Sequence, residues 1–219
     1  MGVDNRNAVS VSGSGSIMRT RMTAPDRKRQ IILSALRLAY EFGPSQVTTG
    51  MIAQDLGITQ PALYKHFPRK GDIWTAVADH LSEHINQNIQ SSTENSSDPL
   101  TQLFDLVLGH LEIVLEFPAL PEFMVARDTA GDMAIIQTKI RAAMTPYLSQ
   151  LLQNVQSAIQ QGVFRANLNP NDATALIFGV IQSVVLHMLI TRTMDHLLAD
   201  GKRLLELQLA GFTTKEENQ

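Results

Sequence analysis

Residues 47–67 read Val-Thr-Thr-Gly-Met-Ile-Ala-Gln-Asp-Leu-Gly-Ile-Thr-Gln-Pro-Ala-Leu-Tyr-Lys-His-Phe, and they carry the strongest structural signal in the chain. Thr48 is a good helix N-cap, because its side-chain oxygen can accept from the free amides of a first turn. Gly57 suits a tight turn, since glycine adopts positive φ at little cost. The stretch between them predicts a short helix over about 48–56. This helix would bury three apolar side chains, Ile52, Ala53 and Leu56.

A second short helix is predicted over about 59–67. Thr59 can cap it, and Pro61 lies in its first turn, where a missing amide hydrogen matters little. Leu63 and Phe67 are four residues apart and can face the core together. Two short helices joined by a turn that contains glycine make a helix-turn-helix, whose second helix enters the major groove of DNA.

Polar residues of the second helix have the chemistry to contact DNA. Gln60 can pair bidentately with adenine, and Ala62 can touch a thymine methyl group. Lys65 also lies among the residues that would face base edges. Three further polar side chains, Tyr64, His66 and Lys70, are suited to backbone phosphates, which fix register and supply affinity that depends on salt.

The rest of the sequence is dominated by helical patterns and predicts an all-α fold. Apolar residues recur every three or four positions, and alternating β-branched runs are scarce. The polar segment 91–98, closed by Pro99, marks the clearest boundary along the chain. Pro146 should kink or divide the helix in which it lies. The remaining predicted helices cover residues 26–42, 71–90, 99–117, 121–129, 132–161, 170–192 and 201–212.

The charge of the chain is distributed unevenly. The formal net charge is −3, but residues 1–70 hold ten Lys and Arg against four Asp and Glu, whereas residues 71–219 hold eight against seventeen. A basic front on an acidic body predicts a polyanionic partner for the front. Residues 1–22 are rich in Ser and Gly without an apolar signal segment, which predicts a disordered tail. The absence of cysteine excludes disulfides and thiol chemistry, and it fits a cytoplasmic protein.

One long stretch, residues 173–191, has no charged residue. Its length could cross a bilayer, but Gln182, Ser183 and His187 interrupt it, and Asp172 and Arg192 close it tightly. A helix that is apolar nearly all round can instead be buried in a protein core or a dimer interface. We therefore expect no membrane segment.

The helix-turn-helix stretch and its flanks resemble the TetR/AcrR family of DNA-binding regulators. The resemblance covers about residues 26–75 and rests on an ordered series of motifs: Gly43, Thr48, Ile52-Ala53, Leu56-Gly57-Ile-Thr59, Leu63-Tyr64-Lys-His66-Phe67-Pro-Arg-Lys70 and Ile73. By position, it implies that Thr48, Thr59, Tyr64, His66 and Lys70 hold phosphates, while Gln60, Ala62 and Lys65 read bases. Thr49 and Gly50 depart from the family pattern, and a glycine inside a helix costs about 1 kcal/mol relative to alanine.

The family resemblance also implies the organisation of the molecule. Residues 23–70 would form a three-helix DNA-binding domain, residues 71–90 a connecting helix, and residues 71–219 a helical domain for ligand binding and dimerisation. An apolar pocket among these helices is predicted to involve Phe104, Leu108, His110, Phe123, Met124, Arg127, Gln137, Phe178 and Gln182. The dimer interface is predicted to involve Val180, Val184, His187, Met188, Leu204 and Leu207.

These features predict a dimeric, cytoplasmic regulator that binds double-stranded DNA at a palindromic operator. A ligand-responsive repressor with a small-molecule effector is the main hypothesis. An architectural or adaptor DNA-binding protein of the same fold, without a small ligand, is the alternative. An enzyme is a third class, but the sequence lacks a nucleophile-elbow, P-loop or dinucleotide motif. We expect no catalytic residues and no cofactor.

A short motif on the predicted connecting helix has a second interpretation. His80-Leu-Ser-Glu83-His84 fits the H-x-x-E-H pattern of some zinc peptidases, and the two imidazoles would share one helix face. The sequence offers no identifiable distant acidic ligand. A hinge sensitive to pH or metal and a solvated helix face are the other interpretations. We expect no metal site here.

Overall fold

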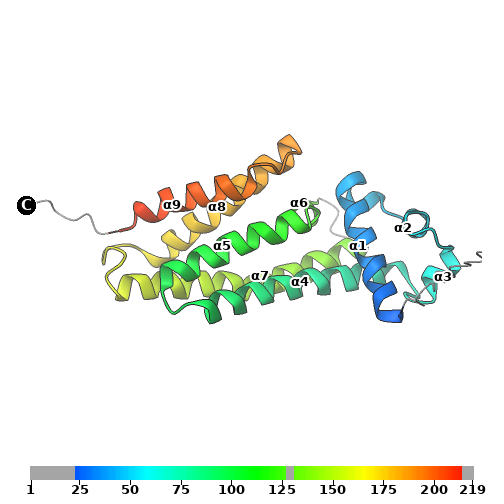
Figure 1. Cartoon of the computed structure of the whole chain (residues 1–219), viewed down its shortest axis with the longest axis horizontal. Coiled ribbons are helices and arrows are strands. Elements are labelled where there is room, and N and C mark those ends of the chain that lie inside the picture. Colours follow the sequence, from blue (N-terminus) through cyan, green and yellow to red (C-terminus); the bar gives the residue numbers. More distant parts are fainter. Residues whose placement is uncertain (1–22, 127–130, 214–219) are drawn as a thin grey trace, which may run out of the picture.

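The computed structural model describes residues 23–126 and 131–213, and within them it is a helical protein (Figure 1). The all-α prediction is confirmed. Besides the nine α-helices in these residues there is a short 3-10 turn at Pro44–Gln46 and one isolated backbone bridge between Phe164 and Thr213. The α-helices are α1 (Ala24–Phe42), α2 (Thr49–Asp55), α3 (Gln60–Tyr64), α4 (Lys70–Asn95), α5 (Pro99–Glu116), α6 (Leu120–Val125), α7 (Gly131–Gln160), α8 (Pro170–Thr191) and α9 (Leu197–Ala210).

The molecule is elongated and has two parts (Figure 1). Helices α1–α3 form a small head at one end, and helices α4–α9 form a bundle along the long axis. Within the bundle, α4 packs against α7 and α5, and α8 packs against α9. Helix α1 packs against α4. Contact between α1 and α4 therefore joins the head to the bundle.

The start of α1 differs from the sequence prediction. Thr23 is the N-cap, and its hydroxyl accepts a hydrogen bond from the Asp26 amide at 3.3 Å. The same hydroxyl donates to the Asp26 carboxylate at 2.5 Å. Asp26 lies in the first turn, where its negative charge also interacts favourably with the helix dipole. The end of α1 is as predicted, because Gly43 caps it at a φ of 86°.

The predicted boundary at the polar segment 91–98 is present, but residues 91–95 belong to a helix, so the linker predicted over the whole segment was wrong there. Helix α4 continues to Asn95, so residues 96–98 alone separate it from α5. The hydroxyls of Ser92 and Thr93 both donate to the carbonyl of Ile89 at 2.8 Å, which satisfies these polar side chains inside the helix. Asp98 then caps α5 by accepting from the Thr101 amide at 2.8 Å. Polar composition therefore marked the boundary before Pro99 but not its width.

Helix α7 continues through Pro146 and is not divided there. The Pro146 ring is exposed, while Ala143 and Tyr147 on either side are buried against the rest of the bundle. Burial of these neighbours supports the helix across the position where proline removes a backbone hydrogen bond.

Helix α8 is the one described helix long and apolar enough to cross a membrane, with a mean hydropathy of 2.1. In the structure it packs against α5, α6, α7 and α9. Its buried side includes Ala173, Ile177 and Ile181. These contacts fit the first of the two predicted places for this helix, a protein core or a dimer interface.

Candidate DNA-binding surface and the helical bundle

Helices α2 and α3 form the predicted helix-turn-helix. The Thr48 hydroxyl accepts from the Met51 amide at 3.2 Å, and the Thr59 hydroxyl accepts from the Ala62 amide at 3.3 Å, so each threonine caps a helix. Gly57 makes the turn between them at a φ of 62°. The side chain of Leu63 is fully buried and that of Phe67 nearly so. This packing fixes which side of α3 faces solvent.

The head is also held together by an ion pair between its first two helices. The Ser34 hydroxyl donates to Asp55 at 2.5 Å, and Arg37 pairs with the same carboxylate. Asp55 ends α2, so these contacts tie its carboxyl end to α1. They set the angle at which α2 presents α3.

The solvent-facing side of α3 carries the polar residues predicted to contact DNA. Gln60, Tyr64 and Lys65 are exposed, whereas Ala62 and His66 are half-buried. The Tyr64 hydroxyl lies 3.2 Å from the Thr49 hydroxyl of α2. Gln60 and Tyr64 lie on α3, Lys65 is its C-cap and His66 follows in the turn, so α3 ends earlier than the predicted residue 67.

The amino end of α4 adds more positive charge beside α3. Lys70 is the first residue of α4, and Arg69 is its N-cap. Arg69 and Asp72 form a capping box, in which the Arg69 amide donates to the Asp72 carboxylate at 2.9 Å. The Arg69 guanidinium also pairs with it at 2.8 Å, and this hydrogen bond holds the pKa of Asp72 below its ordinary value. The Asp72 carboxylate therefore stays ionised and neutralises part of the Arg69 charge.

Two basic residues of this surface were missed at the sequence level, Arg69 and Lys28. The ammonium of Lys28, on α1, lies 5.5 Å from the centre of the Phe67 ring, at the end of the recognition unit. The excess of Lys and Arg in residues 1–70 indicated a basic surface, but it did not identify which basic side chains lie near α3. Long-range packing of α1 on the helix-turn-helix decides that.

The residues predicted to line a ligand pocket are spread over the bundle. Phe104, Leu108 and His110 lie on α5, Phe123 and Met124 on α6, Gln137 on α7, and Phe178 and Gln182 on α8; Arg127 lies outside the described residues. The Gln137 amide donates to the carbonyls of Phe123 and Ala126 at 3.1 and 3.0 Å. The structure therefore joins Gln137 and Phe123, while Gln182 points to solvent. In this conformation the amide of Gln137 holds α6 in place, because backbone groups occupy its donors.

A polar group is buried deeper in the bundle, around the carbonyl of Leu106. The Tyr147 hydroxyl and the Asn88 amide donate to this oxygen at 3.0 and 2.9 Å. The ring centres of His110 and Tyr147 are 5.0 Å apart, and the Nδ1 atom of His110 has no hydrogen-bond partner among the residues that the structure describes. Complete burial lowers the pKa of His110 to about 4 and raises the pKa of Tyr147. His110 is therefore neutral at physiological pH.

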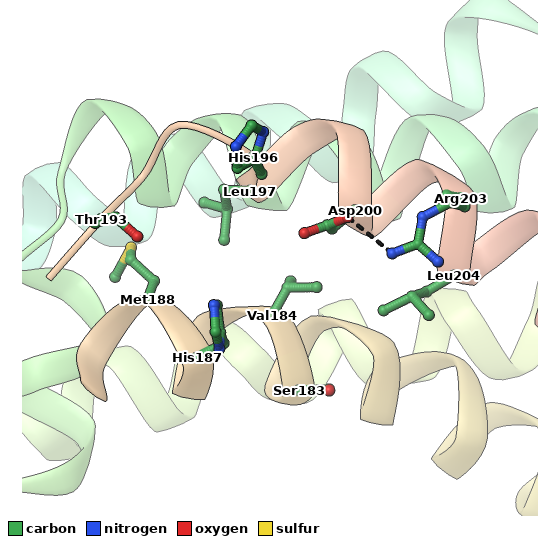
Figure 2. Close-up of a pocket in the computed structure, with 10 residues that line it drawn as sticks. All are labelled: Ser183, Val184, His187, Met188, Thr193, His196, Leu197, Asp200, Arg203 and Leu204. Atoms are coloured by element: carbon green, nitrogen blue, oxygen red, sulfur yellow. Dashed lines mark hydrogen bonds and ion pairs between the residues drawn. The ribbon is translucent and has the colours of Figure 1, made fainter. Parts of the chain in front are cut away.

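The residues predicted for the dimer interface divide into buried and exposed sets. Val180, Val184 and Met188 are 7%, 6% and 2% exposed, so they pack inside one chain and leave little surface for a partner. Leu207 is 70% exposed. Val184, Met188, His187 and Leu204 line a cavity of about 240 Å³ between α8 and α9 (Figure 2). On the α9 side of this cavity, Asp200 and Arg203 form an ion pair at 2.8 Å.

His80 and His84 share one face of α4, as their spacing predicted. The centres of the two imidazole rings are 4.7 Å apart. The centre of the Phe117 ring lies 5.2 Å from the His80 ring centre and 4.9 Å from the His84 ring centre. The pKa of His80 is lowered, mainly by burial and then by the nearby positive charges of His84 and Arg29. The carboxylates of Glu83 and Glu116 raise this pKa, but by less. Among residues 23–126 and 131–213, no group of three or more His, Asp or Glu side chains is placed to hold a metal ion.

An exposed helix-turn-helix joined to a larger helical bundle is the architecture of a DNA-binding transcriptional regulator. Residues 31–77 match the model of bacterial regulatory proteins of the tetR family, and residues 78–211 match the model of the YsiA-like protein C-terminal region. The chain therefore belongs to the TetR family.

Known relatives are similar at modest identity. The regulator TtgR of Pseudomonas putida is 25% identical over 198 residues, covering 88% of this chain and 94% of its own. The nucleoid occlusion factor SlmA of Haemophilus influenzae is 22% identical, and the match spans 55% of this chain and only 56% of that relative. The structure of FadR from Bacillus subtilis, in complex with stearoyl-CoA, has a TM-score of 0.64 at 24% identity over 84% of this chain and 98% of that one.

Proposed function

We propose that the protein is a ligand-responsive repressor that binds a palindromic operator as a homodimer. The observation that carries this proposal is the solvent-facing side of α3, where Gln60, Tyr64 and Lys65 are exposed beside Lys70. In this proposal Gln60, Ala62 and Lys65 face base edges, while Thr48, Thr59, Tyr64, His66 and Lys70 face phosphates. The capping bonds of Thr48 and Thr59 leave their hydroxyls at the surface of the head.

Dimerisation is proposed through the outer face of α8 and α9. Large apolar side chains are exposed there: Leu176, Leu186, Ile190 and Leu207. Leu186 and Ile190 are four residues apart and share a helix face. Covering this face with the same face of a second copy is the isologous arrangement of a twofold dimer. Such a dimer presents two α3 helices to two half-sites, as a palindromic operator requires.

Arg192 provides a route by which the bundle can influence the head. This residue ends α8, and its guanidinium pairs with Glu122 of α6. It also lies 5.5 Å from the centre of the Tyr40 ring of α1. One side chain at the end of α8 thus contacts two other elements, α6 and the head helix α1. A ligand that displaced α6 or α8 would change the position of α1, and it could lower DNA affinity by its preference for that second geometry.

A small-molecule effector is supported by the similar proteins. The FadR structure holds stearoyl-CoA, and TtgR is named as a transcriptional regulator. The test is operator affinity with and without a ligand whose binding has been shown separately. We expect a loss of 5- to 150-fold, the usual range of allosteric coupling. Unchanged affinity at saturating ligand would overturn the ligand-responsive part of the proposal.

Selection of genomic fragments by the purified protein tests the DNA-binding part. The variants Tyr64→Ala and Lys70→Ala serve as controls, and binding is repeated across salt concentrations. We expect one or a few palindromic sites, with affinity that falls as salt rises, because phosphate contacts release counterions. Both variants should bind more weakly. Failure to retain any DNA at low salt would refute the assignment.

An architectural or adaptor role is the second candidate. SlmA proteins, which are named as nucleoid occlusion factors, are among the similar proteins, and the one from a Marinomonas species is 25% identical over 74% of this chain. The buried core around His110 and Tyr147 would then serve stability rather than ligand binding. Many dispersed chromosomal sites in the same selection would favour this role over that of a local repressor.

A further inference from the structure

Gly50 of α2 faces the side chain of Gln60 of α3. A Cβ atom placed on Gly50 would lie 2.9 Å from the Gln60 amide nitrogen and 3.9 Å from its amide carbon. A separation below 3.0 Å is not adopted by real Cβ atoms, so the Gln60 amide occupies space that any other residue at position 50 would fill. Gly50 lies inside a helix and is not among the glycines with positive φ. Backbone conformation therefore does not require glycine here.

Thr49, the neighbour of Gly50, contacts another DNA-facing side chain. Its hydroxyl is 3.2 Å from the Tyr64 hydroxyl. Thr49 is 8% exposed and Tyr64 40% exposed, so a buried group holds the tip of a surface phenol. The first two residues of α2 thus each face one side chain of α3, and both depart from the family pattern.

We propose that Thr49 and Gly50 are positioning residues that set operator preference without touching a base. Gly50 leaves the space in which the Gln60 amide lies, and Thr49 fixes the direction of the Tyr64 phenol. The Gln60 amide is then held in one orientation for hydrogen bonding to adenine. The Tyr64 hydroxyl is held in one position for contact with a backbone phosphate, which fixes the register of the protein on DNA. This inference rests on the proposed function, because it assumes that α3 meets DNA.

The Gly50→Ala substitution separates this role from a purely structural one. The atoms that a new Cβ would meet belong to the end of a flexible side chain, so the protein should fold with Gln60 displaced. Alanine inside α2 should raise the melting temperature, since it is the better helix former. We nevertheless expect the preference for adenine at one position of each half-site to fall about tenfold, the worth of one bidentate pair.

The experiment is a double-mutant cycle on selected operators, read as base preference at each position. Full-length wild type, Gly50→Ala, Gln60→Ala and the double variant are compared, with melting measured in parallel. We expect Gly50→Ala to change preference at the same position as Gln60→Ala and to have no further effect in the Gln60→Ala background. An unchanged base profile in Gly50→Ala, or an equal change in both backgrounds, would overturn the role of Gly50.

Thr49→Val gives an independent arm. It removes the hydroxyl while keeping the size of the side chain nearly constant. We expect affinity for all sequences to fall about threefold, with base preference unchanged, because a single neutral hydrogen bond is lost. No further loss is expected when Tyr64→Phe is also present. An equal loss in the Tyr64→Phe background would overturn the role of Thr49. If the wild type selected no DNA, the proposed function itself would fail, which is a different outcome from any of these.

Discussion

At the scale of single residues, His110 shows how burial converts an ionisable group into a pH-sensitive element. It lies on α5 with its Nδ1 atom unpaired, beside Tyr147 and far from solvent. The charged imidazolium would have neither water nor a carboxylate partner there, so the neutral form is strongly favoured. Its pKa falls to about 4 in the folded chain, against an ordinary value of 6.5.

The folded protein should therefore lose stability in mild acid through His110. Because the folded pKa is lower than the unfolded one, the unfolded chain binds the proton first as pH falls from about 6.5 towards 4. Between pH 7 and pH 5 we expect His110 to reduce the free energy of unfolding by about 2 kcal/mol. Urea unfolding of wild type and His110→Gln at both pH values measures this difference. The exposed His187→Gln is the control, and an identical pH dependence in wild type and His110→Gln would contradict the prediction.

At the scale of elements, the end of α8 combines a backbone constraint with an ion pair. Arg192 caps the helix in the left-handed region at a φ of 56°, where it is the one non-glycine residue of the described chain. The side chain of Glu122, its partner, is only 9% exposed, whereas that of Arg192 is 58% exposed. The pair is therefore partly screened by water, and it stabilises less than a fully buried pair would.

Two substitutions of Arg192 separate these effects. Arg192→Ala and Arg192→Gly both remove the ion pair with Glu122 and the contact with Tyr40, so both should be less stable than wild type. Only glycine adopts the left-handed conformation without a steric cost, so Arg192→Gly should be more stable than Arg192→Ala by about 1 kcal/mol. Chemical denaturation of the three proteins gives the comparison. Equal stability of the two variants would show that the cap is not held in this conformation.

A proline inside a long helix offers a second prediction at this scale. Pro146 is exposed in α7 and cannot donate the backbone hydrogen bond of its turn. Pro146→Ala should raise the free energy of unfolding by about 2 kcal/mol, because it restores that donor and removes a ring clash. Pro170→Ala, at the first position of α8, is the matched control, since proline is tolerated there. A comparable effect of both substitutions would contradict this reasoning.

At the scale of the whole molecule, a single chain leaves the large apolar side chains on the outer face of α8 and α9 exposed to water. Ile190 is 73% exposed, and Leu186 lies one turn before it. In the dimer proposed above, these side chains form the interaction surface between the two copies. If two copies pair through this face, the interface positions the two heads, and operator binding depends on it.

A charge on this face should therefore abolish both dimerisation and tight DNA binding. We expect Ile190→Glu to sediment as a monomer and to bind the operator at least tenfold more weakly, because a buried, unpaired carboxylate opposes the interface. Leu148→Glu introduces the same charge at an exposed apolar site of α7 and should leave both properties intact. A dimer of Ile190→Glu with unchanged operator affinity would place the interface elsewhere.

The local features of this protein could be predicted from its sequence. Thr48, Gly57 and Thr59 set the caps and the turn of the helix-turn-helix, and the structure has them in these roles. The helix boundaries near Gly43, Pro99 and Pro170 were predicted for the same reason. Capping, glycine turns and proline at a first turn act between residues a few positions apart, so the spacing of residue types is sufficient to identify them.

Only the tertiary structure decided which faces are buried and which distant side chains meet. An uncharged helix such as α8 has apolar residues on all sides, so its sequence could not tell that Val184 packs inward while Ile190 faces outward. The proximity of Gln60 to Gly50, and the contacts of Arg192 with Glu122 and Tyr40, could not be predicted from the spacing of neighbouring residues. These outcomes depend on partners far apart in the chain, because burial and charge pairing are settled by the packing of whole helices and not by the propensity of any one.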